Sequence, residues 1–291
     1  MDVISKGYVA DRIYNYATLM RLKTSLVVLR YVCPSLYALW LAGKGRPDPL
    51  IVVIFIVGAI VMRSAGCVIN DYIDRDIDSK VARTRNRPLV TGKVSTREAL
   101  ILFAFLCFCA FLLVAFLNTL TIILAFVGLG LTILYPFCKR FFFSPELVVS
   151  FAICWGVVLA FAAQAGSVPL LAWRVFAATV LLMISEATIY AIADRDEDLM
   201  IGLKSTAIFL KHYDRLVIGL LQFSGAFLLI YIGYKESLNY FYYIALGFAV
   251  GSLLYGQYLI KDYEAEKCIR AWKNYSWFWL IILIGVLIGY E

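Results

Sequence analysis

Two groups of closely spaced aspartates each follow a long apolar segment of this chain of 291 residues. The first group reads N-D-Y-I-D-R-D-I-D at 70–78, and the second reads A-D-R-D-E-D at 193–198. Carboxylates at this density beside a membrane segment are costly unless they bind cations. Basic residues follow each group within a few positions: Lys80, Arg83, Arg85, Arg87 and Lys204. Because Mg²⁺ in proteins is commonly shared between a few carboxylates and phosphate oxygens, the two groups predict a site for a metal and a diphosphate.

Helical periodicity divides each acidic group into two faces. If residues 70–78 continue the preceding helix, three aspartates of the first group fall within about 60° of arc: Asp71, Asp74 and Asp78. Asp76 points to the opposite side. In the second group, Asp194 and Asp198 are one turn apart, and Asp196 is turned away. Like charges on one face destabilise a bare helix, so two matched groups favour cation binding over the alternative of solvated helix ends.

The composition places these groups in a membrane protein, since 63% of the residues are apolar and 16% are charged. Apolar stretches of about 20 residues can span a bilayer. We predict nine such spans: 24–43, 49–69, 98–117, 119–137, 146–166, 170–190, 216–234, 238–259 and 272–290. The short joins at 117–119 and 166–170 predict helical hairpins. We expect an all-α, polytopic protein with residues 1–291 forming a single domain.

The distribution of Lys and Arg predicts the orientation in the membrane. Most of these residues outside the spans lie after the second, fourth, sixth and eighth spans or at the N-terminus. The N-terminal ones are Lys6, Arg12, Arg21 and Lys23, whereas the opposite segments hold Lys44, Arg46 and Lys235. By the positive-inside rule, the N-terminus and both acidic groups are cytoplasmic, and Glu291 is outside. The net charge of +7 reflects this topology and anion binding, so we expect no nucleic-acid partner.

The N-terminal segment, the cysteines and the histidine argue against a signal peptide, disulfide bonds and a zinc site. Residues 1–23 mix Asp2 and Asp11 with basic residues and lack an apolar core, so we expect no signal peptide. The seven cysteines include no C-x-x-C pair, which argues against a disulfide framework or a zinc site. The single histidine, His212, lies in a basic segment and is expected to be solvated.

Four segments between residues 62 and 206 carry a family resemblance. They read M-R-S-A-G-C-V-I-N-D-Y-I-D-R-D-I-D-S-K-V-A-R-T-R-N-R-P-L at 62–89, Y-P-F-C-K-R at 135–140, A-F-A-A-Q-A-G-S-V-P at 160–169 and Y-A-I-A-D-R-D-E-D-L-M-I-G-L-K-S-T at 190–206. Together they resemble the UbiA superfamily of intramembrane prenyltransferases, most closely its 4-hydroxybenzoate polyprenyltransferase branch. The resemblance implies nine helices around a central cavity that opens to lipid, with cytoplasmic cap loops at about 70–97 and 191–215.

The resemblance also implies the residues of the site. Mg²⁺ and the prenyl diphosphate would be held by residues of the two acidic motifs: Asn70, Asp71, Asp74, Asp78, Asp194 and Asp198. Four of them would be essential for catalysis: Asp74, Asp78, Asp194 and Asp198. The positions that match diphosphate contacts are Arg83, Arg87, Lys139 and Lys204. Tyr135 and Arg140 match positions near the reacting end, where Arg140 would pair with the acceptor carboxylate.

The implied activity is prenylation of an aromatic ring with release of diphosphate. The donor would be a polyprenyl diphosphate and the acceptor 4-hydroxybenzoate, in ubiquinone biosynthesis at the bacterial cytoplasmic (inner) membrane. Mg²⁺ and basic residues would stabilise the departing diphosphate, and a closed apolar cavity would keep water from the allylic cation. Glu186 is one candidate for the base that removes the ring proton.

The chain departs from the family pattern at two places, and both concern the acceptor. R-L-D-K-P-I-G of the family reads R-L-K-T-S-L-V at 21–27, and Arg30 follows inside the first span. Y-D-T-Q-Y-A reads E-A-T-I-Y-A at 186–191, so Ala187 replaces an aspartate. A paralogue acting on another aromatic acid or phenol is therefore an alternative. Arg63 fits either the acidic face of its helix or an interfacial position.

Two further alternatives come from other classes. A cation-coupled transporter would carry its carboxylates near mid-span, often on broken helices, whereas here they lie at the membrane boundary. Other prenyltransferase branches act on a naphthoate, homogentisate or haem. The stretch R-S-A-G-C-V-I-N-D at 63–71 argues against these branches.

Overall fold

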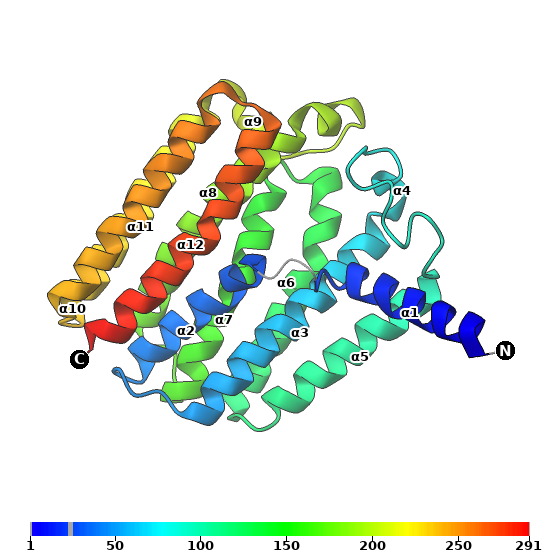
Figure 1. Ribbon diagram of the computed structural model, residues 1–291. Helices are drawn as coiled ribbons and strands as arrows, with labels where there is room; N and C mark the ends of the chain where they lie inside the picture. Colours follow the sequence, from blue (N-terminus) through cyan, green and yellow to red (C-terminus); the bar gives the residue numbers. More distant parts are fainter. Residues whose placement is uncertain (1, 23–25, 291) are drawn as a thin grey trace.

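The computed structural model describes residues 2–22 and 26–290, and every regular element in them is a helix (Figure 1). The α-helices are α1 (Asp2–Leu19), α2 (Leu29–Ala42), α3 (Pro49–Ile73), α4 (Arg75–Asp78), α5 (Thr96–Val114), α6 (Thr119–Phe141), α7 (Pro145–Ala165), α8 (Leu170–Met200), α9 (Thr206–Leu210), α10 (Asp214–Lys235), α11 (Tyr240–Leu259) and α12 (Ala265–Gly289). Short 3₁₀ turns are Leu26–Val28, Lys211–Tyr213 and Ile260–Asp262. The predicted all-α class is confirmed.

The helices confirm a multi-pass membrane protein. Eight helical stretches in the described part of the chain are long and apolar enough to cross a membrane, and Leu26–Ala42 is a shorter apolar one. They follow the nine predicted spans in order. The first is shorter than the predicted 24–43, because α2 begins only at Leu29. Lys23 and Glu291, which entered the prediction of orientation, lie outside the described residues.

Polar residues fix where the membrane helices begin. The side chain of Asp48 caps the first turn of α3, and Ser95 and Glu98 form a capping box at the start of α5. Asn118 and Asn239 cap α6 and α11 in the same way. These side chains satisfy amide groups that an apolar sequence leaves without partners, so each apolar segment starts at a defined position.

α8 is the central helix of the bundle. In its apolar stretch 72% of the residues are buried, compared with 11% in α6. It approaches α10 closely at Gly225, where an added Cβ would lie 2.6 Å from Leu182 Cγ. The Tyr275 hydroxyl of α12 lies 2.7 Å from Ser185 Oγ and accepts a hydrogen bond from Gln222 at 2.6 Å. Close packing and buried hydrogen bonds thus hold α8, α10 and α12 together.

The two predicted hairpins differ in their packing. The chain reverses at both turns, and α7 packs along α8. In contrast, α5 packs mainly on α3 and α6 mainly on α7, with little contact between α5 and α6. Their separation leaves both helices available to line an internal cavity.

The segments that carry the acidic groups meet at one end of the bundle. Figure 1 shows α4 and α9 at this end and the C-terminus at the opposite end. The additional helix α1, which no apolar pattern predicted, is tied to the same end, because Arg12 Nη1 donates to Lys93 O at 3.1 Å. Arg12 also pairs with Glu98 at the start of α5.

Candidate active site

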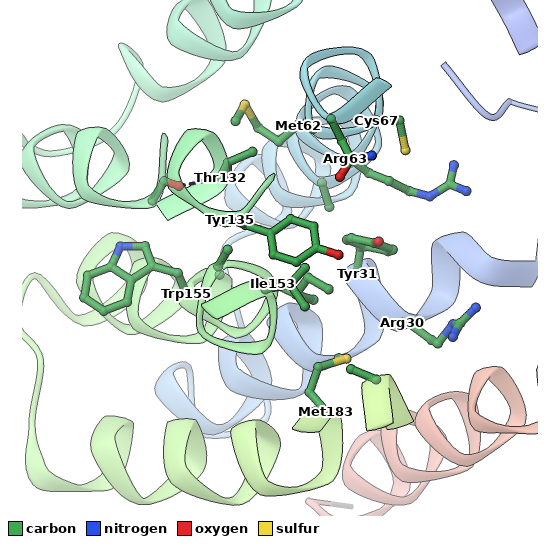
Figure 2. Close-up of a pocket in the computed structure, with 18 of the residues that line it drawn as sticks. Arg30, Tyr31, Met62, Arg63, Cys67, Thr132, Tyr135, Ile153, Trp155 and Met183 are labelled. Carbon is green, nitrogen blue, oxygen red and sulfur yellow. Dashed lines mark hydrogen bonds between the residues drawn. The ribbon is translucent and has the colours of Figure 1, made fainter. Parts of the chain in front are cut away.

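A cavity of about 540 Å³ extends from the two acidic segments into the apolar interior of the bundle. Residues of α2, α3, α5, α6, α7, α8 and α12 line it. Figure 2 shows its apolar part, where Met62, Ile153 and Trp155 surround Tyr135. The cavity therefore has a charged end and an apolar compartment.

The first acidic segment is not the single continuous helix on which the predicted division into two faces rests. α3 ends at Ile73, and Asp74, with φ −89° and ψ 2°, separates it from the short α4. Hydrogen bonds cross the break, from Asp74 N to Asn70 O at 2.9 Å and from Asp78 N to Asp74 O at 2.8 Å. The side chains therefore keep nearly the helical phase. Asp74 and Asp78 are buried, whereas the side chain of Asp76 is 83% exposed.

Arg87 joins two buried carboxylates of this segment. Its Nη1 lies 2.9 Å from Asp71 Oδ1 and 2.5 Å from Asp78 Oδ2. Arg21 donates to both oxygens of Asp71, at 2.9 and 3.0 Å. Burial raises the pKa of Asp78, and the Arg87 charge opposes this shift. Both carboxylates thus have basic side chains to neutralise them.

Lys139, near the end of α6, reaches the same segment. Its Nζ lies 2.6 Å from Asp74 Oδ2 and 3.3 Å from Asn70 Oδ1. The ammonium is also 5.1 Å from the centroid of the Tyr135 ring. Asp74 Oδ1 is buried and has no hydrogen-bond partner in the described part of the chain. A buried carboxylate oxygen without a partner beside a cavity is available to a ligand.

The second acidic segment lies on α8, which continues through it without a break. Arg83 binds Asp194, with Nε and Nη2 at 3.2 and 2.5 Å from its two oxygens. Asp198 lines the cavity one turn further on, whereas Asp196 is exposed. Burial lowers the pKa of Arg83, but Tyr190 and Asp194 raise it, and the net shift is upward. Arg83, from the segment that follows the first acidic group, is therefore charged and holds an aspartate of the second group.

The last two basic residues of the prediction have different positions. Lys204 lines the cavity, and its Nζ donates to Phe141 O at 3.3 Å. Arg140 is not among the residues that line the cavity, and its Nη2 donates to Ile73 O at 2.8 Å. Successive helical residues point about 100° apart, so when Lys139 faces the cavity, Arg140 faces away. The geometry gives no support to the expected pairing of Arg140 with an acceptor carboxylate.

Five charged residues line the cavity beyond the motif positions: Arg21, Arg30, Arg63, Glu146 and Glu186. Arg63 is 6% exposed and donates to Arg21 O at 3.1 Å, which excludes the interfacial position considered for it. Arg30 and Glu186, which lie beside the two departures from the family pattern, form an ion pair across 156 positions of sequence. A charge inside an apolar span was the available signal, but finding its partner required the fold.

The donor atoms at the charged end fit a divalent cation that shares its ligands with a diphosphate. In the described part of the chain, no three Asp, Glu, His or Cys side chains converge into a metal site by themselves. The aspartates and Asn70 nevertheless supply hard oxygen donors along one end of the cavity, including the partnerless Asp74 Oδ1. Mg²⁺ is usually bound through one or two carboxylates together with substrate phosphates, and this donor set fits that mode.

Solved structures share the fold. A UbiA homolog from Aeropyrum pernix K1 aligns with a TM-score of 0.80 and 24% identity, over 89% of this chain and 97% of that one. A UbiA homolog from Archaeoglobus fulgidus, solved with GPP and Mg²⁺, aligns with a TM-score of 0.69 and 17% identity, over 94% and 99% of the two chains.

Sequence relatives and a family model give the closer relationship. A 4-hydroxybenzoate octaprenyltransferase of Nitrosococcus oceani is 48% identical over 96% of this chain and 98% of its own length. A 4-hydroxybenzoate octaprenyltransferase of Coxiella burnetii is 44% identical over 97% of this chain and 98% of its own length. The model of the UbiA prenyltransferase family matches residues 31–282. The chain therefore belongs to the UbiA prenyltransferase family.

Proposed function

We propose that this protein transfers a polyprenyl group from a polyprenyl diphosphate to a ring carbon of 4-hydroxybenzoate, a step of ubiquinone biosynthesis. The observation that carries the proposal is the cavity that joins paired acidic and basic side chains to an apolar compartment. Relatives at 44 and 48% identity over nearly the whole chain bear the name of this activity. The site and the family thus support the same reaction.

The charged end would bind the diphosphate of the donor. Four basic residues there are available for its oxygens: Arg83, Arg87, Lys139 and Lys204. Three of them now pair with aspartates, so donor binding replaces ion pairs within the protein by contacts to phosphate. Mg²⁺, held by Asn70, Asp74, Asp78, Asp194 and Asp198, supplies charge stabilisation for the departing diphosphate. Asp71, also expected as a ligand, holds Arg87 in place.

The apolar compartment would hold the prenyl chain and exclude water. Its wall includes Met62, Ile153 and Trp155 (Figure 2), together with residues of α5 and α6. During transfer, the bond between the allylic carbon and the diphosphate oxygen breaks, and a ring carbon ortho to the phenol oxygen bonds to that carbon. The ring then loses a proton. Exclusion of water prevents its attack on the allylic cation.

Membrane orientation completes the proposal. The basic segments and both acidic groups lie at one end of the bundle, which we place on the cytoplasmic side of the bacterial inner membrane together with the N-terminus. Residues 1–291 then act as one domain, with the segments at about 70–97 and 191–215 covering the cavity. Soluble diphosphates and Mg²⁺ are available on that side.

The test is incubation of the purified protein with Mg²⁺, mixed prenyl diphosphates and a panel of phenolic acids, followed by mass spectrometry. We expect prenylated 4-hydroxybenzoate. Prenylation of a different phenol would leave the reaction class standing and change the acceptor. Absence of any product, combined with cation flux in proteoliposomes, would replace the enzyme by a transporter.

A further inference from the structure

Two charged side chains from apolar helices meet in the cavity wall. Arg30 of α2 and Glu186 of α8 form an ion pair between Nη1 and Oε1, and their side chains are 3% and 4% exposed. The ring centroid of Trp272, on α12, lies 3.7 Å from the guanidinium carbon. All three residues line the cavity. The group therefore ties three helices together beside the space for ligands.

The pair leaves part of its hydrogen-bonding capacity unused. Within the described residues, Arg30 Nε and Nη2 have no acceptor, and Glu186 Oε2 has no donor. The buried indole nitrogen of Trp279 also has no hydrogen-bond partner among the described residues. Buried donors of a charged group are costly to leave unsatisfied, and a pair that only joined helices would use them. Unused donors beside a cavity point to a ligand that accepts hydrogen bonds.

The unused edge of Arg30 has the form of a carboxylate site. With Nη1 on Glu186, Nε and Nη2 remain as a planar fork that matches two carboxylate oxygens. Trp272 fixes the plane of this fork. Figure 2 shows Tyr31 between Arg30 and Arg63, with the Tyr135 hydroxyl pointing toward Tyr31. An aromatic ring attached to the carboxylate would thus lie against aromatic side chains.

We infer that Arg30 binds the carboxylate of the aromatic acceptor through Nε and Nη2, and that Glu186 positions the guanidinium. The inference rests on the proposed function and assigns the acceptor to the aromatic acids, not to neutral phenols. Glu186 also repels the bound carboxylate, because both carry negative charge. The two members of the pair therefore affect acceptor affinity in opposite directions.

The opposite signs give the test. Steady-state kinetics would be measured for 4-hydroxybenzoate and for 4-hydroxybenzamide, which has the same shape without the charge. Arg30→Gln should raise the KM for 4-hydroxybenzoate about tenfold or more and leave the KM of the prenyl donor within about threefold. The same substitution should raise the KM for 4-hydroxybenzamide far less. Arg30→Lys should recover part of the loss, since an ammonium lacks the fork, and Glu186→Gln should lower the KM for 4-hydroxybenzoate.

Controls separate this inference from simpler explanations. Arg174→Gln removes an arginine that stacks on Tyr231 and does not line the cavity, and it should leave both acceptors unchanged. Calorimetric binding of 4-hydroxybenzoate gives the affinities without turnover, and thermal unfolding reports the fold of each variant. If Arg30→Gln fails to fold, the direction of the change in acceptor KM in Glu186→Gln tests the inference by itself.

The outcomes distinguish two kinds of failure. If the wild-type protein prenylates no acceptor, the proposed function fails. If it prenylates 4-hydroxybenzoate but Arg30→Gln affects acid and amide equally, the pair only joins helices and the inference is overturned. A weaker affinity in Glu186→Gln overturns it as well, because the repulsion argument requires a gain.

Discussion

The aspartates of the site differ in their partners and exposure, and these differences predict how sensitive each position is to substitution. Asp74→Asn and Asp194→Asn should each lower turnover by more than about 100-fold, or about 2.7 kcal/mol, because both carboxylates face the cavity and contact its basic residues. Asp76→Asn and Asp196→Asn should have little effect, since these side chains are exposed. Initial rates on folded protein in detergent measure all four. Equal losses at every position would contradict the division into two faces.

Lys139 and Arg140 are neighbours in sequence with different environments. Arg140→Gln should leave the KM of both substrates within about threefold, because its guanidinium binds the Ile73 carbonyl outside the cavity wall. Lys139→Gln should raise the KM of the prenyl donor strongly, since it removes a charge at the diphosphate end. The pair of variants is compared by initial-rate kinetics with each substrate varied in turn. A rise confined to the acceptor KM in Arg140→Gln would restore the sequence-based assignment.

At the level of the helices, sequence predicts the apolar spans well and their interruptions poorly. Hydropathy finds the spans because about 20 apolar residues are required wherever a helix crosses lipid. The break at Asp74 escapes prediction because hydrogen bonding and side-chain phase continue almost unchanged across it. α1 escapes it because that helix is tied down by tertiary contacts such as the one from Arg12 to Lys93 O.

For the site, too, features that are local in the sequence were predicted, and contacts between distant segments were not. The acidic motifs and their flanking basic residues are local in sequence, so spacing predicted which carboxylates share a face. Contacts between distant segments, such as Arg21 with Asp71, follow from the packing of helices. The pair of Arg30 and Glu186 is the clearest case, because its members lie 156 positions apart and the sequence around either residue does not identify its partner.

Close contact between α8 and α10 gives a prediction about helix packing. Gly225→Ala should destabilise the protein by about 1 to 3 kcal/mol, because the added methyl would meet Leu182 and the Ala178 carbonyl. Gly247→Ala is the matched control on α11, where a Cβ meets nothing within 4 Å, and it should be neutral or slightly stabilising. Thermal unfolding in detergent measures both. Equal stability of the two variants would mean that α8 and α10 can separate without cost.

For the molecule as a whole, metal dependence should appear in activity and not in folding. Four of the five aspartates of the site, Asp71, Asp74, Asp78 and Asp194, already have basic partners without a metal ion. EDTA should therefore abolish prenyl transfer, with recovery on addition of Mg²⁺, while the unfolding temperature of the protein without donor stays nearly constant. Both are measured on the same detergent-purified sample. Full activity in the chelator would remove the metal from the proposal, and unfolding by EDTA would show a structural ion.

The ion pair between α2 and α8 has a consequence for biogenesis. α2 is only 14 residues long and carries Arg30 at its second position, and a charge in an isolated membrane helix opposes insertion, by about 2.5 to 3.5 kcal/mol at the centre and by less toward an end. Glu186, which offsets that charge, lies on α8 and is synthesised only after four further membrane helices, α3, α5, α6 and α7. We therefore expect α2, the first span of the chain, to settle in the bilayer only after α8 has left the ribosome.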